Sequence, residues 1–169
     1  MTSPSTHPNK TVDSLKSSTP ETIRRVGVIG GGQLAWMMAL EAKELGIELV
    51  VQTPNASDPA VAIAADAILA PIADAAATDR LAAQCEVITF ENEFIDLKAL
   101  ADLAGKGVQF YPRLEALAPL LDKYDQRCYL RQIGLPTPQF ATLTSEAELP
   151  SLPQQADKLG FPLVLKTRR

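Results

Sequence analysis

The sequence predicts an α/β fold in which helices cover both faces of a parallel β-sheet. Short apolar segments typical of buried strands alternate with helical patterns of ten or more residues from position 24 onward. Three glycines at positions 30–32 separate the first of these strands from the first helix. Because parallel strands need long crossover connections, which are usually helical, the alternation indicates a Rossmann-like arrangement.

The expected elements follow one another closely. Strands are expected over residues 25–30, 47–53, 86–91 and 108–112, and helices over residues 33–46, 75–85 and 95–107. Gly46 is suited to end the first helix in the C′ position. An apolar stripe predicts the face that this helix buries, and its members are Leu34, Met37, Met38, Ala42 and Leu45.

Composition divides the chain into three parts. Residues 1–23 are rich in Ser, Thr and Pro and have few large apolar side chains, so we expect a disordered leader without a secretory signal. Residues 24–112 form the Rossmann-like domain. Residues 113–169 predict linker helices interrupted near Pro119, a helix over 145–160 and a strand over 161–166. Because no partner or cap follows that strand, we expect an incomplete second domain.

The composition also excludes several classes of function. A net charge of −4 with scattered Lys and Arg residues gives no reason to expect a nucleic-acid partner. No uninterrupted apolar run reaches about 18 residues, so we expect no transmembrane helix and no membrane partner. Cys85 and Cys128 lack the paired spacing of a zinc or redox site, so we expect reduced, partly buried thiols and a cytoplasmic location. The only histidine, His7, lies in the leader, which excludes histidine triads and histidine metal sites.

The glycine turn fits the dinucleotide fingerprint only in part. Residues 30–35 satisfy the pattern G-x-G-x-x-A between a strand and a helix, where glycine lets the backbone approach a phosphate. An NAD site also needs an acid at the end of the second strand to bind the ribose hydroxyls. That strand ends in Gln52, and the first acid, Asp58, lies several residues into the loop. An NAD-binding Rossmann oxidoreductase or sensor is therefore the alternative interpretation.

Further segments follow the glycine turn in a characteristic order, namely an acidic pair after VITF, then IGLPTPQF, then VLKTRR. Together with GVIGGGQLAWMMALEAKELGI and SDPAVAIAADAIL, they resemble the amino-terminal part of the 5-(carboxyamino)imidazole ribonucleotide synthase family of the ATP-grasp superfamily. The resemblance covers residues 24–169. The sequence departs from the family pattern at Ala35 and Trp36, where members commonly have Gly-Arg, and over residues 90–94, where both acids are kept.

The resemblance implies a C–N ligase of de novo purine biosynthesis. In that reaction ATP phosphorylates bicarbonate to carboxyphosphate, and the carboxyl group passes to the exocyclic amine of aminoimidazole ribonucleotide. The resemblance further implies a pre-ATP-grasp domain followed by the start of an ATP-grasp domain, a homodimer, and Mg²⁺ whose ligands lie downstream of this chain. Such chemistry depends on positioning and charge neutralisation, so we expect no catalytic side chain here. We expect the isolated chain to be an inactive fragment. A second alternative is a non-enzymatic product of a partial gene copy.

The resemblance also assigns candidate ribonucleotide-binding residues. Gly32, Gln33 and Leu34 fall on the glycine turn, and Glu91 falls on the acid that follows the strand VITF. A carboxylate accepts hydrogen bonds from an amine or from ribose hydroxyls, whereas a Gln amide and free N–H groups donate to phosphate. The alternative for Glu91 is that it caps the following helix, and Glu93 stays open between the two roles.

Two lysines are the candidate ATP-binding residues. Lys166 ends the expected strand 161–166 and matches the strand-end lysine of the ATP-grasp fold, where an amine reaches phosphate as a point charge. Lys123 falls where the family has a basic residue that contacts ATP, although a solvated helix lysine is the alternative. Arg168 and Arg169 match the basic pair that precedes the family's glycine-rich loop.

Overall fold

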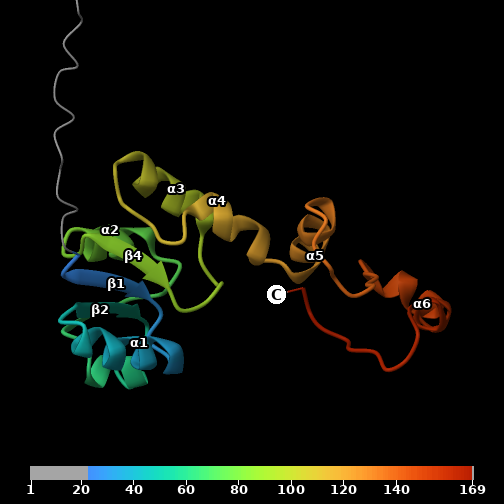
Figure 1. The fold of residues 1–169 in the computed structure, drawn as a ribbon, viewed down its shortest axis with the longest axis horizontal. Helices are drawn as coiled ribbons and strands as arrows, with labels where there is room; N and C mark the ends of the chain where they lie inside the picture. Colours follow the sequence, from blue (N-terminus) through green and yellow to red (C-terminus); the bar gives the residue numbers. More distant parts are fainter. Residues whose placement is uncertain (1–22, 169) are drawn as a thin grey trace, which may run out of the picture.

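The computed structural model describes residues 23–168 and confirms the α/β class. Its centre is a four-stranded, fully parallel sheet in the order β3-β2-β1-β4 (Figure 1). The strands are β1 (Arg25–Ile29), β2 (Glu48–Thr53), β3 (Asp66–Leu69) and β4 (Val87–Phe90). The expected leader falls almost entirely outside the described residues, as does His7.

Helices cover both faces of this sheet, as the alternating pattern predicts. Figure 1 shows α1 (Gln33–Glu44) on one face and α2 (Ala75–Ala82) with α3 (Leu97–Gly105) on the other. Successive strand residues point to opposite faces, so the sheet has one core on each side. Val28 packs in the first core, beneath α1, and Ile29 packs in the second core, on the opposite face. That second core joins β2 and β4 to α2, α3 and the segment beyond them, through residues such as Leu81, Ile88 and Leu100.

The face that α1 buries differs from the expected one. Its buried residues are Ala35, Ala39 and Ala42, whereas Leu34 is 55% and Leu45 is 74% exposed. The stripe prediction is confirmed for Ala42 and for Met38, which packs against the first core, and was wrong for Leu34, Met37 and Leu45, because it followed side-chain size. Small side chains let the helix lie close to the sheet directly after the glycine turn, which large ones would prevent. Gly46 does end the helix, with φ +69° just after the C-cap residue.

A buried hydrogen-bond network joins β2 to the loop and helix that follow β3. Gln52 is fully buried, and its amide nitrogen donates to the carbonyl oxygens of Pro71 at 2.7 Å and Asp74 at 3.1 Å. The hydroxyl of Thr78 in α2 donates to its amide oxygen at 2.8 Å. All of the polar atoms of this amide are therefore paired inside the core, where an unpaired one is costly.

Two parts of the sheet differ from expectation. Strand β3 is absent from the expected elements because its sequence, DAIL, is short, and none of its apolar side chains is fully buried. The strand expected over residues 108–112 is reduced to a single parallel bridge with β4, between Phe110 and Ile88. In that bridge the Ile88 N–H donates to the Gln109 carbonyl and the Tyr111 N–H donates to the Ile88 carbonyl, each at 2.8 Å.

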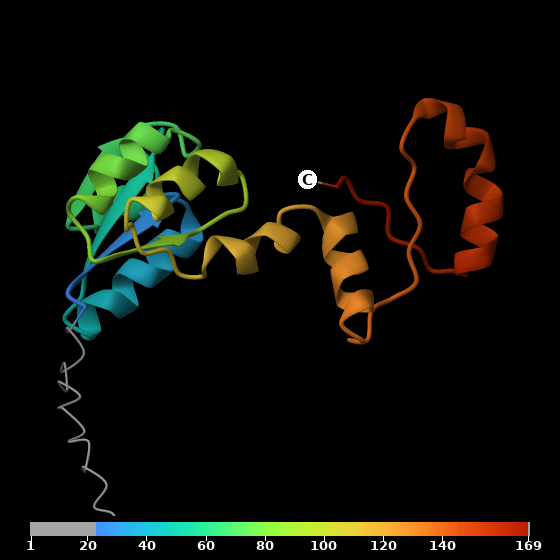
Figure 2. The same cartoon turned by 90° about the horizontal axis from the view of Figure 1, so that it is seen from above.

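The rest of the chain extends away from this domain (Figure 2). It contains α4 (Leu114–Leu117), η2 (Ala118–Leu120), α5 (Lys123–Gln132), η3 (Glu146–Ser151) and α6 (Leu152–Leu159). The interruption near Pro119 and the helix over 145–160 are confirmed. The strand over 161–166 is wrong, since the structure assigns no strand to residues 161–168. With no sheet neighbour in the described part of the chain, Val164 and Leu165 are 78% and 84% exposed.

Both cysteines are free thiols, but only Cys85 is half-buried, and Cys128 is exposed. The expectation of partly buried thiols was therefore wrong for Cys128. None of the helices within residues 23–168 is long and apolar enough to cross a membrane.

Amide hydrogen exchange should divide the chain into two regions. We expect the strongest protection in β1 and β2, whose residues pair on the inside of the sheet, and weak protection over residues 161–168, whose side chains are exposed. Exchange read residue by residue by NMR checks this. Protection over 161–168 equal to that of β1 would contradict it.

Replacement of Gln52 by Ala should lower the free energy of unfolding by about 2–4 kcal/mol, because it removes the three hydrogen bonds of a fully buried amide and leaves the space of that side chain unfilled. Denaturant titration measures this change. The matched control is Gln109→Ala, which removes an exposed amide bonded only to the nearby Gly107 carbonyl and should change stability by less than about 0.5 kcal/mol. Equal effects of the two substitutions would contradict a structural role for the network.

Candidate functional site

The carboxyl ends of β1 and β4 form the point at which the sheet changes direction. The chain proceeds outward from β1 to β2 and β3, and then returns through α2 to place β4 on the other side of β1. The segments that leave β1 and β4 therefore diverge to opposite faces of the sheet. In parallel α/β sheets ligands bind in the crevice that forms at such a position.

Glu91 lies in this crevice against the glycine turn. Its backbone N–H donates to the Ile29 carbonyl at 2.9 Å, which extends the β1–β4 pairing by one residue. Its carboxylate packs on Gly30 and Gly32 so closely that a Cβ atom at either position would collide with a carboxylate oxygen. Gly30 also has φ +119°, a conformation that favours glycine. The two glycines thus make room for the side chain of Glu91.

The charge of Glu91 lies beside the positive end of α1. Gly32 is the N-cap of that helix, and among the described residues no side chain caps it and no acid occupies its first turn. A carboxylate close to this end interacts favourably with the helix dipole. The side-chain amide of Asn92 donates to the carboxylate at 3.3 Å. A dinucleotide pyrophosphate placed on this turn would meet that negative charge, which counts against the NAD alternative.

The end of β2 counts against an NAD site as well. Gln52, the residue that takes the place of the ribose-binding acid, points into the core and is fully hydrogen-bonded there. The next residue, Thr53, packs on Gly31 and donates its hydroxyl hydrogen bond to the carboxylate of Asp58. Asp58 therefore already has a partner within the chain.

The other predicted ribonucleotide-binding residues lie at the same edge of the sheet. Gln33 is the first residue of α1 and is exposed, directly after the glycine that contacts Glu91. Leu34 follows it and is also exposed. The helix-capping alternative for Glu91 is wrong, because the side chain of Asp96 accepts the hydrogen bonds from the first N–H groups of α3.

A hollow of ≈ 380 Å³ connects this edge with the beginning of α5. One wall is the end of β4 and the other is the segment from Pro112 to α5; the lining residues are Phe90, Glu91, Asn92, Glu93, Pro112, Leu117, Leu120, Leu121, Lys123 and Gln126. Glu91 and the half-buried Lys123 therefore line one hollow. Asn92 and Gln126 were not among the sequence candidates. The position of Asn92 beside Glu91 was the available signal, whereas nothing in the sequence distinguishes Gln126 from a surface residue.

Lys166 is exposed on the extended segment after α6 and does not line this hollow. That segment does contact the first turn of α5, because the Lys123 N–H donates to the Arg168 carbonyl at 2.9 Å. The guanidinium of Arg168 hydrogen-bonds Asp122, the N-cap of α5, and this bond is the main reason that the pKa of the Asp122 carboxyl lies below its ordinary value.

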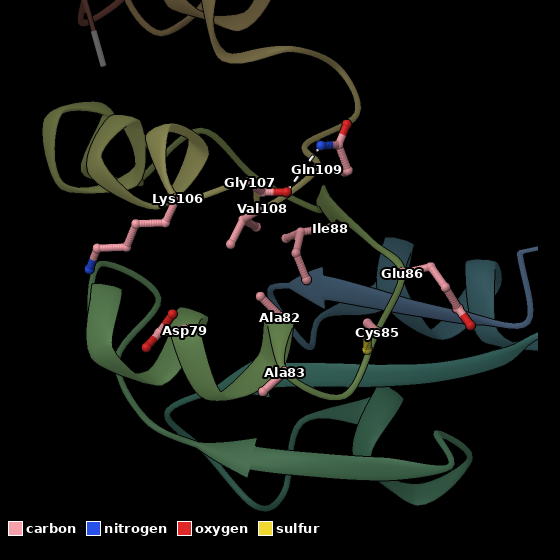
Figure 3. Close-up of a pocket in the computed structure, with 10 residues that line it drawn as sticks. All are labelled: Asp79, Ala82, Ala83, Cys85, Glu86, Ile88, Lys106, Gly107, Val108 and Gln109. Carbon is pink, nitrogen blue, oxygen red and sulfur yellow. Dashed lines mark hydrogen bonds between the residues drawn. The ribbon is translucent and has the colours of Figure 1, made fainter.

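A second hollow, of ≈ 340 Å³, lies at the opposite end of β4 (Figure 3). Residues from the end of α2, the start of β4 and the segment after α3 line it, and none of the predicted site residues is among them. Burial raises the pKa of the Cys85 thiol there to about 11, so the thiol is protonated at neutral pH and is a poor nucleophile. Within residues 23–168 no group of three or more His, Cys, Asp or Glu side chains is arranged to bind a metal ion.

Comparison with known proteins gives a consistent result. The family model for the ribonucleotide synthetase preATP-grasp domain matches residues 23–120. The N5-carboxyaminoimidazole ribonucleotide synthase of Synechococcus elongatus is 57% identical over 147 residues, which cover 87% of this chain and 36% of that protein. The chain therefore spans little more than a third of the length of this relative.

Solved structures of the same kind of enzyme share the fold. The N5-carboxyaminoimidazole ribonucleotide synthetase of Thermotoga maritima superposes with a TM-score of 0.68 at 32% identity, covering 82% of this chain and 37% of that one. The synthase of Aspergillus clavatus, solved in complex with ADP and 5-aminoimidazole ribonucleotide, gives 0.65 at 31% identity, covering 78% and 36%. With more than half of its length matched by the family model, the chain belongs to the family of ribonucleotide synthetase preATP-grasp domains.

Proposed function

We propose that this chain supplies the ribonucleotide-binding domain, and part of the ATP-binding site, of an enzyme that carboxylates 5-aminoimidazole ribonucleotide in purine biosynthesis. In the reaction the γ-phosphoryl group of ATP passes to bicarbonate, giving ADP and carboxyphosphate. The exocyclic amine then attacks the carboxyl carbon, phosphate leaves, and 5-(carboxyamino)imidazole ribonucleotide forms. The observation that carries the proposal is the carboxylate of Glu91 on the glycine turn, in one hollow with Lys123.

The role of Glu91 follows from its charge and surroundings. An ionised carboxylate only accepts hydrogen bonds, so it selects the donors of the ribonucleotide, which are its amine and its ribose hydroxyls. It repels a phosphate from the part of the turn that it covers. Asn92, which donates to Glu91 at 3.3 Å, restricts the orientation of the carboxylate and so improves its selectivity.

The remaining groups at this edge serve the other parts of the ribonucleotide. Gln33 lies at the positive end of α1, and its exposed amide donates to the phosphate at a point that the Glu91 carboxylate does not cover. The N–H groups near Gly32 add to that donor set, and Leu34 offers an apolar contact beside them. Glycine at position 32 leaves the Glu91 carboxylate in this place, because a Cβ atom there would meet it.

Lys123 and Lys166 serve ATP in this proposal. Lys123 is half-buried and Lys166 is exposed. Each carries its positive charge on a long flexible side chain, which suits it to neutralise the charge that develops as the γ-phosphoryl group is transferred. Lys123 lines the hollow that also holds Glu91, so it stands between the two substrates. ATP is the ligand in the solved structure of a carboxyaminoimidazole ribonucleotide synthase from Aspergillus clavatus.

Several further parts of the proposal concern the whole enzyme. They are bicarbonate as the carboxyl donor, Mg²⁺ on the nucleotide phosphates, a homodimer and a cytoplasmic location. The division of the chain into a pre-ATP-grasp domain at residues 24–112 and the start of an ATP-grasp domain at residues 113–169 is also part of the proposal. Because residues 23–168 contain no group of acids arranged for a metal ion, we assign no role toward Mg²⁺ to any of them.

Replacement of Glu91 by Gln tests the ribonucleotide site. In a hybrid, residues 24–168 replace the corresponding part of the Synechococcus elongatus enzyme, with which the chain shares 57% identity. We expect the parent hybrid to hydrolyse ATP in a manner that depends on 5-aminoimidazole ribonucleotide. Glu91→Gln should lower kcat/KM for the ribonucleotide by roughly tenfold or more, the scale of a lost charged hydrogen bond.

The matched control is Glu44→Gln, which removes a carboxylate at the far end of α1 and should leave the kinetics unchanged. Unchanged kinetics for Glu91→Gln would show that the carboxylate serves only the fold. If the parent hybrid is folded, as judged by its amide NMR spectrum, but shows no ribonucleotide-dependent activity, the proposed function itself is contradicted.

Titration with NAD and NADP tests the alternative function. We expect no saturable binding at millimolar concentrations, because Glu91 covers the glycine turn and Gln52 is engaged in the core. Perturbation of the amide resonances near Gly30 is the measurement. Micromolar affinity for either dinucleotide would contradict the proposal and favour a Rossmann oxidoreductase or sensor.

A further inference from the structure

The two candidate ATP-binding lysines lie on segments that are distant in the sequence. Lys123 begins α5, whereas Lys166 lies on the extended segment that follows α6. No strand pairing holds this segment within residues 23–168, and its apolar side chains, such as Leu165, are largely exposed. Some other contact must therefore determine where Lys166 lies relative to Lys123.

Arg168 makes that contact with both its backbone and its side chain. Its carbonyl oxygen accepts the hydrogen bond of the Lys123 N–H at 2.9 Å. Its guanidinium donates through Nε to Asp122 Oδ2 at 2.7 Å and through Nη2 to Asp125 Oδ1 at 3.2 Å. The guanidinium carbon also lies 5.0 Å from the centre of the Tyr124 ring. All four partners belong to the beginning of α5.

Asp122 is the centre of this arrangement. Its Oδ1 atom accepts hydrogen bonds from the N–H groups of Tyr124 and Asp125, at 2.8 and 3.0 Å, and so caps the helix. Its Oδ2 atom is left to bind Arg168. With its side chain only 16% exposed, Asp122 is the best protected of the charged groups involved. The carboxylate that starts α5 therefore also fixes the segment carrying Lys166.

We propose that Arg168 is a positioning residue, which fastens the segment carrying Lys166 to the first turn of α5 so that Lys123 and Lys166 approach the same ATP phosphates. This inference rests on the proposed function. Lys166 and Arg168 are two positions apart in the sequence, a separation of at most about 7 Å of extended chain. Both lysine ammonium groups can then reach one triphosphate on their flexible stems.

The shape of the guanidinium explains why an arginine occupies this position. Its planar fork reaches two carboxylates while one face lies over an aromatic ring, which a lysine ammonium cannot do at once. Exposed ion pairs are individually weak, and Arg168 is 47% exposed. The fastening therefore depends on several contacts made together, and its loss should produce effects of several-fold.

A crosslinking experiment on the 169-residue chain tests the fastening. A short amine-reactive crosslinker should join Lys123 to Lys166 in the native chain, with the yield measured by mass spectrometry. We expect Arg168→Gln to lower this yield by about threefold to tenfold, and Arg168→Lys to restore part of it. The matched control is Arg131→Gln, which removes an arginine of α5 that lies over the Phe140 ring and should leave the yield unchanged. An unchanged yield in Arg168→Gln would overturn the inference.

Two further readouts separate positioning from a merely structural role. The pKa of Asp122 should rise toward its ordinary value of 3.8 in Arg168→Gln, because the main cause of its lowering is removed. ATP should slow acetylation of Lys123 and Lys166 by similar factors in the native chain and by unequal factors in Arg168→Gln. Equal slowing in the variant would overturn the positioning role alone. Slowing at neither lysine of the native chain would contradict their proposed role toward ATP, and the inference with it.

Discussion

The close contact between the Glu91 carboxylate and the glycine turn is the constraint on which the candidate site depends. It requires β1 and β4 to be neighbours in the sheet, since the residue that follows β4 must reach the turn that follows β1. It favours glycine at positions 30 and 32, because a Cβ atom at either position would meet the side chain of Glu91, and Gly30 also has φ +119°. It also places a negative charge beside the uncapped start of α1, which that charge stabilises. Sheet order, turn composition and helix electrostatics thus all contribute to this one contact.

The same contact changes which ligand groups the glycine-rich turn can bind. A glycine-rich turn between a strand and a helix is generally a phosphate site, because its backbone N–H groups are free and the helix dipole is positive there. Here a carboxylate of the chain occupies part of that position, so the turn offers a hydrogen-bond acceptor together with its remaining donors. At the end of β2, Gln52 is engaged in the core instead of binding a ribose. In the proposed function, these two features suit the turn to a ligand that has hydroxyl or amine donors together with a phosphate.

The sequence predicts the alternation of strands and helices well, because strands buried on both faces are nearly continuous apolar runs. It predicts the face of α1 poorly, since the need for close approach to the sheet favours Ala35 and Ala39 over larger apolar residues. Strand β3 and the failure of residues 161–166 to form a strand depend on neighbours that local patterns do not contain. The pairing of Gly32 with Glu91 was accessible through the rule that parallel strands end at one edge. The hollow shared by Glu91 and Lys123 was not, because it depends on the path of the chain between them.

Different interactions stabilise the two halves of the described chain. From β1 to α3, packed apolar side chains and buried hydrogen bonds such as those of Gln52 fix the positions of the site residues. Beyond α4, few side chains are buried, and the segment at residues 161–168 contacts the start of α5 through Arg168. Polar contacts of this kind are screened by water and salt, so they break and form at little cost. In the proposed function, a rigid edge of the sheet would orient the ribonucleotide, while the weakly held segment that carries Lys166 could move as the phosphates of ATP are enclosed.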